Sequence, residues 1–177
     1  LAGYVSATVS AIRWLTFTPE LRLDTYDVNG TFARDLGPRL SARIALNDET
    51  ALRAAGGHFT QLPNLPLQIP GAEAFGLKLL GLQSSWQGSL GVETTHFAAI
   101  ELALTGFLQS YVLTELRNPT ASSPDPLADD FLIRRDALSY GVELLARRPV
   151  TNRLHGWLSY TLSNSLRSYG GGAIGPS

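Results

Sequence analysis

Histidine is the residue type in this 177-residue chain that most often binds metals or moves protons at neutral pH. The three histidines, His58, His96 and His155, lie far apart in the sequence, and none belongs to a His-Glu-x-x-His motif or another paired-ligand spacing. The chain contains no cysteine, which excludes a disulfide framework and a thiolate metal site. The sequence therefore predicts no metal site, and we interpret the histidines as residues of a rim or an interior wall.

Two further motifs could in principle bind ligands. Asp125, Asp129 and Asp130 could bind a cation, but they lack the one-residue spacing and the turn glycine of a calcium-binding loop. Gly170, Gly172 and Gly175 match the dinucleotide fingerprint, but the chain ends too soon after them for the helix whose N-terminus would hold a phosphate. We therefore expect solvated loops at both places and no cofactor.

Catalytic chemistry needs a nucleophile, a base or a carboxylate pair at a defined spacing. The sequence contains no nucleophile elbow, no triad spacing and no carboxylate pair fixed by helical or strand periodicity. We predict that the chain is not an enzyme.

The composition excludes two other classes of protein. Lys plus Arg (14) nearly cancels Asp plus Glu (15), so the chain is neither a polybasic nucleic-acid binder nor an acidic disordered tail. Charged residues make up 16%, well below the usual share of about 25%, whereas the hydrophobic share of 44% is ordinary. Something other than charge must therefore make up part of the surface.

No segment is suited to cross a membrane as a helix. The longest uncharged window, residues 54–72, contains Pro63, Pro66 and Pro70 and several amide side chains. It is therefore not the run of about 20 apolar residues that a membrane-spanning helix requires. The chain opens on the strand-like residues 1–5, so we expect that a signal peptide was removed or never present.

Strict alternation of apolar and polar residues is the strongest pattern. In residues 15–25 the odd positions are apolar up to Leu23 and the even positions carry Thr, Glu, Arg and Asp, as in a strand with one oily and one polar face. Similar alternation predicts eight strands in total: residues 1–11, 15–25, 38–46, 51–60, 85–95, 99–113, 137–147 and 154–165.

The lengths of the predicted connections decide between a soluble sandwich and a membrane barrel. Short turns are expected near residues 11–14, 47–50, 95–98 and 148–153, and long loops at 27–37, 61–84 and 114–136. Short turns at one rim and long loops at the other are typical of an outer-membrane barrel.

We therefore predict an all-β fold, an antiparallel meander of about eight strands from a larger transmembrane β-barrel. Counting strands places both ends of the meander at the outer rim, whereas a complete small barrel has both ends in the periplasm. Residues 1–177 are thus predicted to form one partial outer-membrane barrel domain without a plug domain. The parity of Leu21, Leu40, Leu102 and Val142 is expected to face lipid.

Four phrases of the sequence resemble barrel strands of TonB-dependent outer-membrane receptors. They are residues 41–61, 89–93 (Ser-Leu-Gly-Val-Glu), 140–149 (Tyr-Gly-Val-Glu-Leu-Leu-Ala-Arg-Arg-Pro) and 156–163 (Gly-Trp-Leu-Ser-Tyr-Thr-Leu-Ser). The resemblance implies a barrel of about 22 strands, a separate plug domain and import of a scarce nutrient such as an iron chelate. It also implies partners: the lipid bilayer of the bacterial outer membrane, the remaining strands, a TonB-type energy-coupling protein and a small-molecule or chelate ligand. A passive porin and a structural or adhesive barrel remain alternatives.

The candidate site residues form two groups. Charges on the polar parity are predicted to line the lumen, where they contact a plug, line the transport path or form salt bridges with one another. They are Glu20, Arg22, Arg39, Arg43, Arg53, Glu93, Glu101, Glu143 and Arg147.

Ligand recognition is expected in the long loops, chiefly residues 61–84 and 114–136, because loops on a rigid scaffold commonly carry binding. The stretch 73–82 is unusually apolar for an exposed loop. We expect it to pack on itself; the alternatives are a short helix over the mouth of the barrel and a surface for a partner or ligand. The ligand-loop candidates are Phe75, Lys78, Asp125, Asp129 and Asp130.

Overall fold

The computed structural model describes residues 1–63, 77–78, 81–97, 100–116, 132–151, 154–168 and 174–176. Within them ten strands form one antiparallel sheet. Their bounds are β1 (Ala2–Ser6), β2 (Val9–Ile12), β3 (Leu15–Val28), β4 (Thr31–Ala45), β5 (Thr50–Gln61), β6 (Gln83–Phe97), β7 (Ile100–Leu116), β8 (Leu132–Thr151), β9 (Leu154–Ser168) and β10 (Ile174–Pro176).

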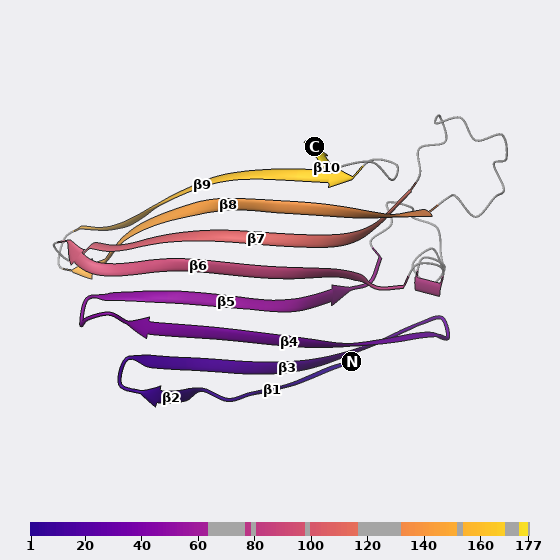
Figure 1. Ribbon diagram of the computed structural model, residues 1–177, viewed down its shortest axis with the longest axis horizontal. Helices are drawn as coiled ribbons and strands as arrows, with labels where there is room; N and C mark the ends of the chain where they lie inside the picture. Colours follow the sequence, from indigo (N-terminus) through magenta and orange to yellow (C-terminus); the bar gives the residue numbers. More distant parts are fainter. Residues whose placement is uncertain are drawn as a thin grey trace.

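The strands follow one another across the sheet in chain order, so the predicted antiparallel meander is confirmed (Figure 1). β1 and β2 both pair with β3, and the order then runs from β3 to β10 without a crossover. Among the described residues, no helix combines the length and the apolar character needed to cross a membrane. The sheet is open, because the strand order begins at β1 and finishes at β10.

In the middle of the sheet the register is regular and keeps the two parities apart; it shifts only near the short turns, between Ser10 and Ile12, Thr94 and Phe97, and Arg148 and Thr151. Leu52 lies opposite Val92, Val92 opposite Leu104, and Leu104 opposite Leu144. Because successive side chains of a strand point to opposite faces, this regular central register gives one apolar and one polar face. We call the side that carries Leu21, Leu40, Leu90, Leu108, Val142 and Leu162 the apolar face, and the opposite side the polar face.

The apolar face is uncovered. Leu90 is 65% exposed and Leu162 61%, although a soluble protein normally buries such side chains. Between Leu138 and Ala146 on β8, and in the paired stretches of β5, β6, β7 and β9, this face carries no Asp, Glu, Lys or Arg. Nine strand residues extend roughly 30 Å, which after tilting fits the apolar band of about 25 Å on a membrane barrel.

The prediction of a long loop over residues 27–37 is wrong. β3 continues to Val28 and β4 begins at Thr31, so only Asn29 and Gly30 form the turn. Their φ values of 50° and 80° are those of a type I′ hairpin turn, for which Asn-Gly is the preferred dipeptide. This connection is therefore a rigid hairpin that extends the sheet.

The other differences concern strand limits. The expected first strand divides into β1 and β2. β7 continues to Leu116 and β8 begins at Leu132, so the third predicted long loop, residues 114–136, is shorter at both ends than expected. A short β10 pairs with the end of β9. The short turns expected near residues 11–14 and 47–50 are confirmed, since two residues separate β2 from β3 and four separate β4 from β5. These turns lie at the left end of the sheet in Figure 1, and the longer connections join strand ends at the right. The strands on either side of the other two expected turns are also only two residues apart, but residues 98–99 and 152–153 lie outside the described residues.

Candidate site on the polar face of the sheet

All nine charged residues predicted to line a lumen lie on the polar face. Glu20 is directly opposite Arg39, Arg43 opposite Arg53, and Glu101 opposite Arg147. Glu143 lies in the same row as Arg53, through Gly91 and Thr105. The structure thus groups these charges on one surface, while their role in lining a lumen stays a prediction.

Arg39 of β4 is held on three sides. Its Nη1 atom donates to Glu20 Oε1 at 3.0 Å, and its guanidinium carbon lies 4.3 Å from the centre of the Phe59 ring. Its side chain lies over Gly57, where an added Cβ would meet Arg39 Cγ at 2.7 Å. The side chains of Arg39 and Glu20 are each 27% exposed, so this ion pair is partly shielded from water. These contacts hold the Arg39 guanidinium against the polar face of the sheet.

Arg43 and Arg53 share a single carboxylate. Arg43 Nε donates to Glu93 Oε1 at 2.9 Å, and Arg53 Nε lies 2.6 Å from Glu93 Oε2. Arg43 belongs to β4 and Glu93 to β6, so the ion pair between them spans β5. Ala51, the β5 residue directly opposite Glu93, is fully buried. Two cations around one anion leave a local charge of one positive unit.

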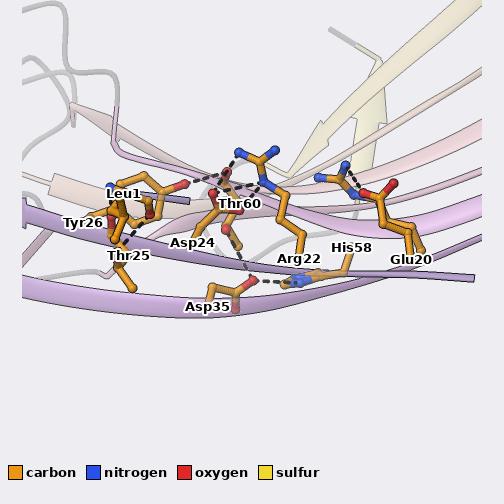
Figure 2. A network of polar contacts seen from close by, with 10 residues as sticks. Leu1, Glu20, Arg22, Asp24, Thr25, Tyr26, Asp35, His58 and Thr60 are labelled. Carbon is orange, nitrogen blue, oxygen red and sulfur yellow. Dashed lines mark hydrogen bonds and ion pairs between the residues drawn. The ribbon is translucent and has the colours of Figure 1, made fainter. Parts of the chain in front are cut away.

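A polar network occupies the end of the sheet next to the Asn29-Gly30 turn (Figure 2). Arg22 binds Asp24 on its own strand through Nε at 2.8 Å and Nη2 at 3.0 Å. Asp35 lies directly opposite Asp24, and its carboxylate contacts His58 Nδ1 at 3.2 Å and accepts from the Thr60 hydroxyl at 3.3 Å. Each of the two facing carboxylates therefore has partners of its own.

These contacts replace a missing part of the β4–β5 ladder. Backbone pairing between the two strands stops at Arg39 and Gly57, although both strands continue. Pro38, which precedes Arg39 and would continue the pairing on β4, has no N–H to donate. Beyond it the strands are bridged by side chains, including His58 to Asp35. His58 also packs on Trp86 of β6, with ring centroids 4.9 Å apart.

Residues that the sequence did not single out complete the polar face. Gln87 and Gln109 lie in the row of Glu20 and Arg39, and Tyr111 donates a hydrogen bond to Gln109. Phe107 also lies on this face, although it is apolar. The parity of these positions was available in the sequence and places them here, but a search restricted to charged residues misses them.

Two hollows lie on the polar face between the charged clusters. One of about 330 Å³ is lined by Glu20, Arg39, Gln87 and Gln109 among others. The other, of about 360 Å³, is lined by Arg43 and Arg53 together with threonine and serine hydroxyls. A larger, open depression of about 1010 Å³ is lined by apolar-face leucines around Gly88 and Gly106 and contains none of the charged candidates. The polar hollows are therefore the more suitable places for a polar ligand.

The remaining site predictions fall mostly outside the described residues. Lys78 is exposed beside the buried Leu77, and both are helical. Phe75, Asp125, Asp129 and Asp130 lie outside the described residues. Within the described ranges, no group of three or more His, Asp or Glu side chains is arranged to hold a metal ion. Glu101 and Arg147 approach to 3.8 Å and are both well exposed.

Comparison with known proteins gives the fold and no closer relationship. No protein-family model and no curated protein matches the sequence. Among solved structures, the siderophore receptor PirA from Pseudomonas aeruginosa matches with a TM-score of 0.59 and 19% identity, over 94% of this chain and 36% of that one. A mutant of the ferric enterobactin receptor PfeA from Pseudomonas aeruginosa matches with a TM-score of 0.61 and 18% identity, over 97% of this chain and 30% of that one.

The chain therefore spans about a third of the length of the solved receptors that it matches. At this level of identity the match concerns the fold alone. The resemblance to barrel strands of TonB-dependent receptors, predicted from four phrases of the sequence, is confirmed as a resemblance of fold: nearly the whole chain has the fold of part of a siderophore-receptor barrel.

Proposed function

We propose that this chain forms part of the barrel wall of a bacterial outer-membrane receptor that imports a scarce nutrient, such as an iron chelate, with energy supplied from the inner membrane. The main support is the match of nearly the whole chain to the barrels of a siderophore receptor and a ferric enterobactin receptor. Neither of these proteins identifies the ligand of this chain.

The two faces of the sheet support a place in a membrane wall. Lipid cannot solvate charge, and Arg or Lys near the bilayer midplane on a barrel's outer surface costs about 2 to 4 kcal/mol. The middle of the apolar face carries no Asp, Glu, Lys or Arg among the described residues, whereas the polar face carries all nine candidate charges. In this proposal the apolar face contacts lipid and the polar face lines the interior.

The proposal requires partners that complete the wall and drive transport. They are the remaining barrel strands, a plug domain that fills the barrel, and a TonB-type protein that couples the receptor to the inner membrane. A passive porin would need neither the plug nor the coupling protein. The dependence of uptake on energy therefore separates the two functions.

Uptake by whole cells tests this proposal. The gene is deleted, and accumulation of radioactive iron from tricatecholate and trihydroxamate chelates is measured in iron-starved cells, with and without a protonophore. We expect the deletion to abolish uptake of at least one chelate, and the protonophore to abolish it in the parent strain. Unchanged accumulation of every chelate after deletion would contradict receptor function, and uptake that persists with the protonophore would indicate passive diffusion.

A further inference from the structure

We propose that Arg43 and Arg53, positioned by Glu93, form a binding site for an oxyanion, a carboxylate or phosphate group, on the polar face of the sheet. The site is defined by contacts within the sheet, so it does not depend on whether the barrel imports an iron chelate.

Arg43 and Arg53 lie directly opposite each other on β4 and β5. Like charges at directly opposite positions of an antiparallel pair repel and destabilise the sheet. Glu93 relieves part of this repulsion, but it provides one negative charge for two positive ones. Three other arginine–carboxylate pairs lie within the described residues, and each joins one cation to one anion: Arg22 with Asp24, Arg39 with Glu20, and Arg147 with Glu101. Of these four groupings, only the one formed by Arg43, Arg53 and Glu93 has an excess of positive charge.

The orientation of the two guanidinium groups suits an additional anion. Both arginines bind Glu93 through Nε, at 2.9 Å and 2.6 Å. Among the described residues, their terminal Nη groups donate no hydrogen bond to a protein acceptor. The side chains are 51% and 65% exposed. Because a guanidinium binds carboxylate or phosphate best through a two-donor fork, these Nη groups remain suitable for such a ligand.

The space next to the two arginines is hollow and lined by hydroxyl groups. Arg43 and Arg53 border the cavity of about 360 Å³, whose wall includes Thr16, Ser41 and Thr105. Thr16 lies directly opposite Arg43 on β3. Hydroxyl groups can donate further hydrogen bonds to an oxyanion held by the guanidinium forks.

A glycine keeps this space open on the side of Arg53. Gly91 lies directly opposite Arg53, and Thr105 lies opposite Gly91 on the next strand. A Cβ at Gly91 would meet Thr105 Oγ1 at 2.7 Å and the backbone oxygen of Leu104 at 2.9 Å. The absence of a side chain therefore allows the Thr105 hydroxyl to approach the row of Arg53. Positive charge, oriented donors and an open hollow together define the proposed oxyanion site.

The reactivity of individual arginines tests the site. The full-length protein in detergent micelles is treated with phenylglyoxal with or without inorganic phosphate, and the modification rate of each arginine is measured by peptide mass spectrometry. Sodium chloride of equal ionic strength controls for screening. Arg147, whose side chain is 61% exposed, is the internal reference because its exposure is similar.

We expect saturating phosphate to slow modification of Arg43 and Arg53 about tenfold, as for a bidentate charge-assisted contact, and to change Arg147 by less than about twofold. The substitution Arg43→Gln should remove the protection of Arg53. Arg13→Gln removes the same charge at the turn after β2 and should leave the protection unchanged.

A carboxylate of the protein itself would give a different and recognisable result. Arg43 and Arg53 would then react slowly even without phosphate, and Arg43→Gln or molar sodium chloride would raise the rate of Arg53 to that of Arg147. The proposal is overturned if both arginines react at the rate of Arg147 in saturating phosphate. It is also overturned if they react slowly under every condition, because simple steric cover would explain that result.

Discussion

Phe107 lies directly opposite Gly141 on the polar face, and its ring occupies the space above the glycine. A Cβ built on Gly141 would lie 2.9 Å from Phe107 Cζ and would also collide with the backbone oxygen of Leu162. An aromatic side chain that covers a cross-strand glycine is a known way to stabilise a sheet where the glycine itself contributes no side chain. The large apolar residue on the polar face therefore has a structural role.

The first prediction concerns this pair. Gly141→Ala should destabilise the full-length protein by about 1 to 3 kcal/mol, because the added methyl group collides with backbone that cannot move away. The midpoint of urea unfolding in micelles, followed by tryptophan fluorescence, measures the loss. Gly156→Ala on β9 is the matched control, since nothing lies within 4 Å of its added Cβ. Equal midpoints for the two variants would show that the close packing is absent.

The second prediction concerns the two faces. Leu90→Arg should reduce assembly of the full-length protein in the outer membrane, because Leu90 is 65% exposed in the middle of the apolar face and a lipid-facing Arg costs about 2 to 4 kcal/mol. Ser89→Arg, one residue away on the polar face, should assemble normally. Heat-modifiable migration in gels measures the assembled fraction. If Ser89→Arg alone failed to assemble, the assignment of the faces would be reversed.

The arrangement of the faces was predictable from the sequence, because strand geometry has a period of two and the charged residues obey it. Every charged candidate from Glu20 to Arg147 therefore lies on the predicted face. The partners of these charges were not predictable. Parity places Arg53 and Glu93 on one face, but only the register places Glu93 diagonally across from Arg53 and within reach of Arg43.

Two features were missed for different reasons. The Asn29-Gly30 dipeptide is the sequence signal of a type I′ hairpin, but the polar residues around it favour a long loop when the sequence is considered alone. The division of the first strand into β1 and β2 has no comparable signal at the break itself, since the two residues there, Ala7 and Thr8, are neither glycine nor proline. A break of that kind depends on pairing with β3.

The third prediction concerns this hairpin. Gly30 has a φ of 80°, which is strained for a residue with a branched Cβ. Gly30→Val should destabilise the protein by about 1 to 2 kcal/mol and should lower the urea midpoint. Thr31→Val, at the start of β4, is the control, because valine is well accepted in strands. A Gly30→Val midpoint equal to that of the parent would argue against the two-residue turn.

The fourth prediction compares two ion pairs on the polar face. Glu20 and Arg39 are each 27% exposed at 3.0 Å, whereas Arg147 and Glu101 are 61% and 45% exposed at 3.8 Å. A double-mutant cycle with glutamine substitutions should give a coupling energy of about 1 kcal/mol for the first pair and about 0.2 kcal/mol for the second, because water screens the exposed pair. Equal couplings would mean that the surroundings of Arg39 do not strengthen its pair.

In the proposed function, one face of the sheet contacts lipid and the other contacts water in the interior of a barrel. Site-directed spin labelling tests this directly. These 177 residues contain no cysteine, so a single introduced cysteine carries the only spin label among them. Labels are placed one at a time at residues 87–92 of β6 in the full-length protein reconstituted in bilayers. Collision rates with oxygen, which concentrates in lipid, and with a water-soluble nickel chelate are then measured.

Oxygen collisions should be highest at positions 88, 90 and 92, and nickel collisions at 87, 89 and 91, so that the two profiles alternate out of phase with a period of two. Profiles that alternate in phase, or high nickel accessibility at position 90, would show that the apolar face does not contact lipid and would contradict the account.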